Sequence, residues 1–409
     1  MTVCRICGEK TRQIVSLGKM PIANGFVKKP SSKEFVFTLK VVFCPVCYMI
    51  QLGETVPPKK MFHEHYQFFS STSHGMEEHF RKQADHIKQL IKNKKNPFVV
   101  EIGSNDGIMI KHIAAANIKH LGVEPSSNVA EVSKKYGVNV TSVFFNKMAA
   151  KEIEKKYGKA DIICGSNVIC HIENINSVFE GVAQLLADDG LFFFEEPYIY
   201  DIIKNNSFDQ IYDEHVYYYS GLSVSNLAKK HGLELVDMKH QGVHGGSMRY
   251  YIKIRHQTIP GKNQISPAVK KFINFEKKLK LNRINGYLGF KKKVDEICSD
   301  LKRLLTKLKS QEQRVVGYAA TSKSTTLLNY AKIGPDLIEY ISDTTPSKIG
   351  LITPGSHIPI KSYEYFSKNH PNYTLLFAYN HKKEIFAKES EYCKKGGKFI
   401  IYFPKVTIE

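Results

Sequence analysis

The sequence predicts an α/β protein in which a small cysteine-stapled unit precedes two domains, each built on a mostly parallel sheet covered by helices. Three observations lead to this fold class. The chain has 409 residues, which is more than one ordinary hydrophobic core accommodates. Four cysteines in two close pairs stand near the N-terminus. Short apolar runs then alternate with amphipathic stretches over residues 97–255 and again from residue 314 onwards, a pattern typical of alternating strands and helices.

The same observations suggest the domain boundaries. We expect a metal-binding domain over residues 1–65, a Rossmann-like domain over residues 66–260, and a third part over residues 261–409. Residues 266–310 are rich in lysine and nearly free of strand signals, so we expect them to form a helical connector. The third part would then end in a second Rossmann-like domain.

Individual elements follow from the spacing of apolar residues. A helix is expected near residues 80–95, because Phe80, Ala84 and Ile87 fall on one face. Strands are expected in the first alternating region at residues 98–102, 120–124, 138–140, 160–164 and 190–194. In the second region they are expected at residues 314–318, 337–341, 373–377 and 397–402.

The chain is strongly basic, with 59 Lys and Arg residues against 39 Asp and Glu residues and a net charge of +20. A positive field favours nucleic acid or a small polyanion such as a nucleotide diphosphate. The basic residues are spread along the chain and do not alternate with aromatic residues, so we expect no nucleic-acid partner. We find no signal peptide and no apolar run long enough to span a bilayer, so we expect a cytoplasmic monomer without a membrane partner.

Two cysteine pairs, Cys4 with Cys7 and Cys44 with Cys47, have the spacing of zinc ligands. Each pair can present two thiolates from one tight turn, and two such turns complete a tetrahedron. Four thiolates leave no open coordination position, so the expected Zn²⁺ is structural and not catalytic. The other four cysteines are scattered, and we expect them to be buried free thiols.

The stretch from Glu101 to Gly107 predicts a cofactor loop between a strand and a helix. Gly103 and Gly107 bracket a turn whose backbone can approach a ligand closely, and Asn105 stands where dinucleotide-binding loops have a second glycine. The acidic Glu101 suits the ammonium group of S-adenosylmethionine (SAM) better than a pyrophosphate. Glu124 ends the next strand, 21 residues beyond Gly103, where a carboxylate can accept both hydroxyls of a ribose. We therefore predict a SAM site formed by these five residues.

Two further positions leave alternatives open. Phe144 and Phe145 follow the third strand and either flank an adenine ring or belong to the core. Asn167 follows the fourth strand, where folds of this type open toward their ligands, and we predict a cofactor contact there. A turn or helix-cap asparagine accounts equally well for Asn167.

The sequence from Tyr212 to His215 brings together three groups suited to proton transfer. Histidine is a general base near neutral pH, Glu214 can orient it, and a tyrosine can donate to a developing oxyanion. An aromatic-rich surface loop would have the same composition, and spacing alone does not distinguish the two.

Taken in order, these motifs resemble the SAM-dependent sugar C-methyltransferases that act on nucleotide-diphosphate keto-deoxysugars. The resemblance covers essentially the whole chain. It implies a class I, Rossmann-like SAM methyltransferase domain between an N-terminal zinc-binding domain and a C-terminal Rossmann-like domain. The matching segments are the two cysteine pairs, 16–24, 101–107, 124–125, 167–171, 212–215, 244–249 and 354–359.

The resemblance also implies roles for individual residues. His215 would be the base that removes the proton beside the ketone, and Tyr212 and Glu214 would hold the substrate and its enolate. Tyr66, in the stretch that ends with Ser70-Ser71, would be the upstream tyrosine of the active site. His171 would line the same pocket.

Three more residues are implied as substrate contacts, namely His244, Arg249 and Lys323, with the C-terminal domain holding the nucleotide sugar. Lys323 can reach a diphosphate, although a solvated surface lysine is the alternative. The loop around it departs from the family pattern, because we expect a glycine near Ala319 and a small residue or proline near Thr321.

The implied reaction is methylation of a sugar carbon, with carbon 3 as the family's usual target. The ketone acidifies the adjacent C–H, a base removes that proton, and the enolate carbon attacks the SAM methyl group. Methylation of oxygen or nitrogen on another small metabolite remains an alternative, because it often needs only desolvation and alignment. A less favoured alternative is an RNA-binding zinc-ribbon protein, and another is a non-catalytic scaffold.

Overall fold

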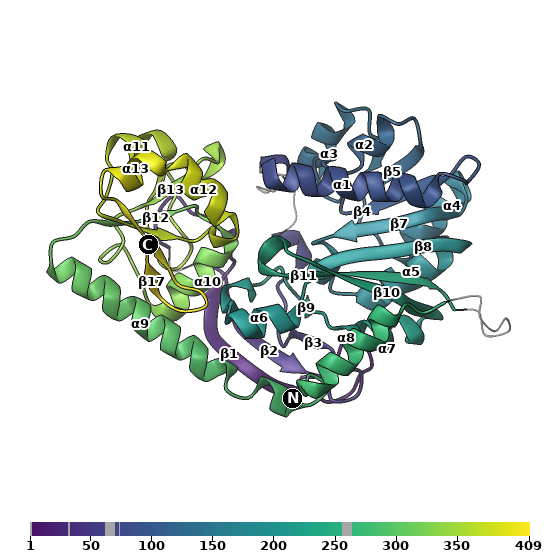
Figure 1. Cartoon of the computed structure of the whole chain (residues 1–409), viewed down its shortest axis with the longest axis horizontal. Coiled ribbons are helices and arrows are strands. Elements are labelled where there is room, and N and C mark those ends of the chain that lie inside the picture. Colours follow the sequence, from purple (N-terminus) through teal and green to yellow (C-terminus); the bar gives the residue numbers. More distant parts are fainter. Residues whose placement is uncertain (1, 32, 62–69, 73, 256–263) are drawn as a thin grey trace.

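Three sheets organise the protein, shown in Figure 1. The computed structural model describes residues 2–31, 33–61, 70–72, 74–255 and 264–409, so Tyr66 lies outside the described residues. In Figure 1 the middle domain (blue to teal) and the C-terminal domain (lime to yellow) stand on opposite sides. The long strands of the N-terminal hairpin (purple) and two green helices run beneath them. The predicted α/β fold class, with its N-terminal zinc-binding part, is confirmed.

The N-terminal sheet has four antiparallel strands in the order β1-β2-β3-β9. The first three belong to the N-terminal part, namely β1 (Arg12–Pro21), β2 (Val36–Phe43) and β3 (Ile50–Leu52). The fourth strand, β9 (Tyr217–Tyr218), comes from the middle of the chain and begins two residues after His215. The metal-binding part therefore shares a sheet with the segment that carries the predicted base.

The middle domain is a seven-stranded sheet in the order β10-β11-β8-β7-β4-β5-β6. Its parallel strands are β4 (Phe98–Ile102), β5 (Lys119–Val123), β6 (Val140–Thr141), β7 (Ala160–Ser166) and β8 (Leu186–Pro197). An antiparallel edge is added by β10 (Leu233–Gln241) and β11 (Ser247–Ile254). The helices are α1 (His74–Ile91), α2 (Lys111–Ala114), α3 (Ser127–Lys134), α4 (Lys147–Tyr157), α5 (Ile175–Leu185), α6 (Ile199–Asn205) and α7 (Gly221–Lys230).

Apolar periodicity explains how these layers pack. The predicted helical face of α1 is buried at Phe80, Ala84, Ile87 and Ile91, and it packs on one side of the sheet. The run Phe192–Phe194 in β8 is completely buried, because helices or other layers cover both faces of a central parallel strand. The second face is covered mainly by α5 and α7, whose apolar residues join the same core as the zinc-binding cysteines.

The C-terminal domain is a six-stranded sheet in the order β14-β13-β12-β15-β16-β17. Its strands are β12 (Val315–Tyr318), β13 (Ile341–Asp343), β14 (Ile360–Ser362), β15 (Tyr373–Leu376), β16 (Lys398–Ile401) and β17 (Thr407–Ile408). Its helices are α10 (Ser322–Ala331), α11 (Tyr363–Lys368), α12 (Lys382–Lys388) and α13 (Ser390–Lys394). The expected helical connector consists of α8 (Pro267–Lys278) and α9 (Phe290–Ser310).

Some expected strands differ from the structure. The strand predicted at residues 337–341 is wrong over most of its length, because Leu337 and Ile338 donate backbone hydrogen bonds to Gly334 in a turn at 3.1 Å. Their side chains are buried in that turn, so a short apolar run in a turn had the same composition as a buried strand. The antiparallel pair β10–β11 and the short β9 were not predicted. Among the described residues, no helix has both the length and the apolar character needed to cross a membrane.

Candidate active site

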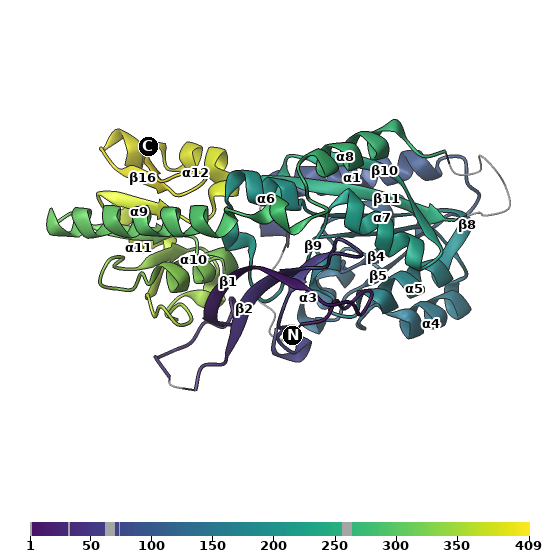
Figure 2. The ribbon, with the colours of Figure 1, turned by 90° about the horizontal axis from the view of Figure 1, so that it is seen from below.

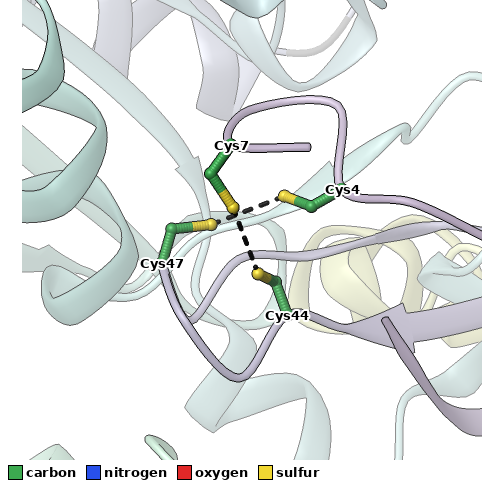
Figure 3. A group of neighbouring side chains, drawn as sticks. All are labelled: Cys4, Cys7, Cys44 and Cys47. Carbon is green, nitrogen blue, oxygen red and sulfur yellow. Dashed lines mark hydrogen bonds between the residues drawn. The ribbon is translucent and has the colours of Figure 1, made fainter. Parts of the chain in front are cut away.

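The four paired cysteines converge at one point, as Figure 3 shows. The Sγ atoms of Cys4 and Cys47 are 3.5 Å apart, those of Cys7 and Cys44 are 3.4 Å apart, and all four lie within 4.8 Å of one another. Four sulfurs at about 2.3 Å from one Zn²⁺ would be separated by roughly 3.8 Å, so the group fits a tetrahedral zinc ion. None of the four lines the large cavity described next, which agrees with a structural role.

A cavity of about 1100 Å³ is lined by residues of all three parts of the chain. In an open α/β sheet, ligands bind where the strand order reverses. In the middle domain this point lies between β4 and β7, and in the C-terminal domain it lies between β12 and β15. Residues that follow all four strands line the cavity. Single-ligand pockets measure roughly 300–1000 Å³, so this cavity is as large as the largest of them.

The predicted cofactor loop forms one wall of the cavity. Gly103 has φ +67°, and a Cβ there would lie 2.3 Å from Cγ2 of Val168. Gly107 has φ +83°, and a Cβ there would lie 2.9 Å from Cβ of Ser133. Asn105 also has a left-handed backbone with φ +48°, which asparagine tolerates better than most residues. The turn therefore requires the residue types found there, and Gly103 and Asn105 reach the cavity wall whereas Gly107 does not.

Glu124 is fixed at the rim of this loop. One carboxylate oxygen accepts a hydrogen bond from the backbone N–H of Asn105 at 3.0 Å, and the other accepts one from Ser126 at 2.8 Å. Burial raises the pKa of Glu124, while the two backbone N–H groups act in the opposite direction. Because the carboxylate is oriented and lines the cavity, it is well suited to accept hydrogen bonds from a diol.

Glu101 lies behind the loop and does not line the cavity. Its side chain is 3% exposed, and its Oε2 atom is buried without a hydrogen-bond partner among the described residues. Burial raises the pKa of Glu101 well above its usual value. Its predicted contact with an ammonium group is therefore not visible in the cavity wall and stays a prediction.

A short 3-10 turn (Ser70–Thr72) covers the cofactor loop, which sequence reasoning did not anticipate. The N–H and Oγ–H groups of Ser71 donate to Oδ2 of Asp106 at 3.0 and 2.6 Å. The N–H group of Ser70 donates to Oδ1 of Asn105 at 3.1 Å. The Ser-Ser motif was the available signal, but only the fold reveals that its partner is the acidic residue inside the loop.

The two open alternatives take different positions. Asn167 lines the cavity with φ +53°, and its N–H donates to the carbonyl of Glu195 at 2.8 Å, so it is a turn residue that also faces the ligand space. Phe144 is 44% exposed and lines the cavity, whereas Phe145 lines it while being 3% exposed and part of the core. Phe145 therefore belongs to the core, and a contact of Phe144 with an adenine ring stays a prediction.

Arg249 does not line the cavity. Its guanidinium donates to the buried carboxylate of Glu195 at 2.7 and 3.0 Å, and the other oxygen of Glu195 lies 2.7 Å from Nε2 of His79. This cluster occupies the C-terminal end of β8 and supports the wall that carries Asn167. In this arrangement Arg249 is paired with Glu195 and does not line the cavity, so its predicted substrate contact stays a prediction.

His215 and Tyr212 form a hydrogen-bonded pair at the cavity. Nδ1 of His215 is 2.8 Å from the carbonyl oxygen of Gln210, so this nitrogen carries the hydrogen. Nε2 therefore has a lone pair, and the phenol of Tyr212 donates to it at 2.8 Å. Burial lowers the pKa of His215 well below its usual value, so the imidazole is neutral and able to accept a proton. Tyr212, Glu214 and His215 all line the cavity.

His171 and His244 also line the cavity, as predicted from the resemblance. The ring centroids of His171 and His215 are 5.2 Å apart, and burial lowers the pKa of His171 to about 4. Burial likewise lowers the pKa of His244 to about 3. Glu196 fixes the turn that carries His171, because one oxygen accepts the N–H groups of Val168, Ile169 and Cys170 at 2.7–3.1 Å. No sequence motif predicted this role of Glu196.

Basic residues concentrate on the C-terminal side of the cavity. Lys323 lies near the start of α10 with its Nζ 5.1 Å from the ring centre of Tyr379, and burial lowers its pKa. Lys348 donates to the carbonyl of Ala320 at 2.9 Å and was not predicted. Both lysines line the cavity, so this wall can accommodate an anionic ligand.

Comparison with known proteins identifies the family. Residues 4–62 match a zinc binding domain, residues 76–238 a methyltransferase domain, and residues 242–404 the C-methyltransferase C-terminal domain. The C-methyltransferase NovU of Streptomyces niveus is 33% identical over 408 residues, covering 99% of this chain and 96% of the relative. The chain belongs to this C-methyltransferase family. It is a SAM-dependent methyltransferase with a structural zinc site.

Two solved methyltransferase structures cover part of this chain. A SAM-dependent methyltransferase from Anabaena variabilis is 15% identical with a TM-score of 0.35, covering 43% of this chain and 84% of that one. A SAM-dependent methyltransferase from Clostridium acetobutylicum is 12% identical with a TM-score of 0.33, covering 43% of this chain and 92% of that one.

Proposed function

We propose that this enzyme transfers the SAM methyl group to a carbon atom, with carbon 3 as the expected position, of a nucleotide-diphosphate keto-deoxysugar. The observation that carries the proposal is the pair formed by Tyr212 and the Nδ1–H tautomer of His215. Carbon methylation needs a base for a C–H bond, and Nε2 of His215 becomes that base once the phenol of Tyr212 turns from it toward the substrate.

The two walls divide the ligands by charge. The middle-domain wall offers the backbone of the cofactor loop and the oriented carboxylate of Glu124, which suit the amino acid and ribose of SAM. The opposite wall offers Lys323 and Lys348, which suit a diphosphate. The sugar would then lie between the two walls, next to His171 and His215.

In the proposed reaction, Nε2 of His215 takes the proton from the carbon beside the ketone, and the electrons of that C–H bond form an enolate. The hydrogen on Nδ1 stays bonded to the carbonyl of Gln210, which stabilises the imidazolium and keeps the ring in place. As substrate binds, the phenol of Tyr212 would turn from Nε2 to donate to the enolate oxygen, and His171 would lie beside that oxygen. The carboxylate of Glu214 would help to hold the substrate, the role that the resemblance implies. Bound SAM supplies the electrophilic methyl group that the enolate carbon takes up.

The test is mass spectrometry of the purified enzyme with SAM and thymidine-diphosphate 4-keto-6-deoxyglucose, or its 3-keto-2,6-dideoxy counterpart, in heavy water. A product heavier by one methyl group, with deuterium exchanged into the substrate beside the ketone, would support an enolate route. SAM binding without product or exchange on any keto-sugar would contradict the proposal and favour methylation of oxygen or nitrogen.

His215→Ala is the matching variant. We expect it to lose turnover by roughly 10²- to 10⁴-fold, the usual contribution of a general base, and to lose deuterium exchange as well. SAM affinity should be unchanged, because Glu124 and the cofactor loop belong to other segments of the cavity lining than His215. A wild-type rate for this variant would remove His215 from the mechanism.

A further inference from the structure

The segment that ends β1 enters the active site from the zinc-binding part of the chain. β1 stops at Pro21, and residues 22–25 make a turn closed by a hydrogen bond from the N–H of Gly25 to the carbonyl of Ile22 at 3.0 Å. This turn is the end of the sequence motif 16–24, which the resemblance singled out without a role. Asn24, at its tip, lines the cavity.

Residues 211–216, which include Tyr212 and His215, are called the catalytic segment here. Two consecutive residues of the turn form hydrogen bonds with this segment. Nδ2 of Asn24 donates to Oε1 of Glu214 at 2.6 Å. The backbone N–H of Ala23 donates to Oδ1 of the buried Asp213 at 2.8 Å. Two adjacent carboxylates of the catalytic segment are therefore held by two adjacent residues of the N-terminal part.

The C-terminal domain closes the same junction. The hydroxyl of Thr325 donates to the carbonyl of Ala23 at 2.8 Å, and that of Thr326 donates to the carbonyl of Ile211 at 2.9 Å. Both threonines are buried in α10, and Figures 1 and 2 show β1 running alongside this helix. Residues 23–24 thus lie between the catalytic segment and the domain that carries Lys323.

The zinc-binding part also grips the far end of the catalytic segment. β9 begins two residues after His215 and pairs with β3, and the N–H of Leu52 donates to the carbonyl of Val216 at 2.8 Å. The zinc-binding part therefore holds this segment at Asp213, Glu214 and Val216, while Thr326 of the C-terminal domain holds it at Ile211. A side chain held in this way keeps its rotamer when substrate enters.

We propose that Asn24 is a positioning residue for the reaction, which holds the carboxylate of Glu214 in its working orientation and makes the zinc-binding domain part of the catalytic apparatus. This inference rests on the proposed function, because it takes Glu214 to act on the substrate. It adds a residue and a purpose for the N-terminal domain that the proposed function does not contain.

Asn24→Ala removes the amide donor, and Asn24→Asp replaces it with an isosteric carboxylate next to Glu214. For Asn24→Ala we expect kcat to fall about 10- to 100-fold, the equivalent of one hydrogen bond to a charged group, with unchanged SAM affinity. For Asn24→Asp we expect a larger loss at neutral pH that partly recovers as the pH falls, because a shared proton can bridge the two carboxylates. The other titratable or charged groups near Glu214 are Lys348 and Cys170, with Asp213 and His215 in its own segment.

The matched control is Asn176→Ala. The amide of Asn176 also joins the middle domain to the zinc-binding part, donating to the carbonyls of Arg5 and Ile6 at 2.9 and 3.2 Å, but Asn176 does not line the cavity. We expect this control to lower the melting temperature while kcat stays near wild type. Zinc content and melting temperature of every variant would identify any that fails to fold.

A double-mutant cycle with Glu214→Ala tests whether Asn24 acts through Glu214. If Asn24 acts through Glu214, adding Asn24→Ala to Glu214→Ala should lower kcat by less than about threefold further. A full additional loss in the double mutant, or a wild-type kcat for Asn24→Ala beside an impaired Glu214→Ala, would overturn this inference alone. A wild-type rate for Glu214→Ala would instead remove Glu214 from the proposed function, and the inference would fall with it.

Discussion

The middle and C-terminal sheets of this C-methyltransferase have the same arrangement of hydrogen bonds at their switch points, where the strand order reverses. The two sheets differ in the side chains that surround this arrangement. In the middle domain, Glu124 follows β5 and accepts backbone N–H groups from the loop after β4 and from the residue two positions further on. In the C-terminal domain, Asp343 at the end of β13 accepts the N–H groups of Ala320 and Thr345, both at 2.7 Å. Each carboxylate ties the loop after the first strand to the end of the second strand.

The loops match in backbone conformation as well. Gly103 has φ +67° and donates its N–H to the carbonyl of Val123 at 2.8 Å. Ala319 has φ +70° and donates its N–H to the carbonyl of Ser342 at the same distance. The glycine expected near Ala319 is therefore absent from a position whose backbone favours it, and the left-handed conformation persists because the neighbouring hydrogen bonds impose it.

The difference between the two sheets lies in charge. The middle-domain loop continues with Asn105 and Asp106, whereas the C-terminal loop continues into α10 with Lys323. The same backbone arrangement can thus serve two ligands of different charge, because the side chains that follow the loop determine the sign of the local electrostatic field. Five substitutions test this comparison.

The largest effect is expected from Gly103→Ala. Its Cβ would lie 2.3 Å from Cγ2 of Val168 in a left-handed backbone. The combined strain and overpacking should cost about 2–5 kcal/mol of stability. Thermal unfolding and SAM titration would measure the loss, and an unchanged melting temperature with normal SAM affinity would contradict the geometry of the loop.

Removing each carboxylate should affect one ligand only. Glu124→Ala should raise the Kd of SAM about 10- to 100-fold, and Asp343→Ala should raise the Kd of thymidine diphosphate by a similar factor. Calorimetric titration of both variants with both ligands gives four values, in which each variant serves as the control for the other. If Asp343→Ala weakened SAM and not the nucleotide, the assignment of the two walls would be wrong.

Lys323→Met should weaken thymidine diphosphate about tenfold and leave SAM unaffected. Burial lowers the pKa of Lys323, so its protonated form is lost at a lower pH than in an ordinary lysine. Nucleotide affinity of the wild type should therefore decline as the pH rises through that lowered pKa, and this decline should vanish in the variant. Lys292→Met changes the net charge equally at a side chain that is 82% exposed, so any nucleotide effect there would point to the general field.

The smallest effect is expected from Ala319→Gly. Relief of the left-handed alanine, about 1–2 kcal/mol, is largely offset by the extra freedom of glycine in the unfolded chain, about 0.5–1 kcal/mol. A slight rise in melting temperature with unchanged nucleotide affinity is the expected result. A marked fall in either quantity would mean that the methyl group of Ala319 makes a contact that outweighs the strain.

Local sequence patterns were sufficient to identify a candidate site where its function depends on a few closely spaced residues. The cysteine pairs, the cofactor loop with Glu124, and the segment Tyr212–His215 could all be identified, because turns and strand ends impose particular residue types at short spacings. The strands β4 and β7 were also predictable, since their buried apolar runs are bounded by glycine-containing turns. For the site, these signals identified only a minority of the residues that line the cavity on the middle-domain side.

Signals failed where the partner of a residue is distant in the sequence. The bonds from Asn24 to Glu214 and from Ser71 to Asp106 join positions that no short pattern relates. Arg249 was expected at the substrate, yet the fold gives its guanidinium to Glu195. Glu196 has no sequence signature because its role is to accept backbone N–H groups from another strand's end.

By itself, the sequence determined the α/β class and the zinc-binding cysteines, and it located the two switch-point loops and the candidate base. These depend on local backbone preferences and on side-chain chemistry, which adjacent residues largely control. The tertiary structure alone decided that the switch points of two sheets share one cavity and that the zinc-stapled hairpin reaches the catalytic segment. Such juxtapositions arise from how buried faces pack across the whole chain, and packing is a property of no single stretch of sequence.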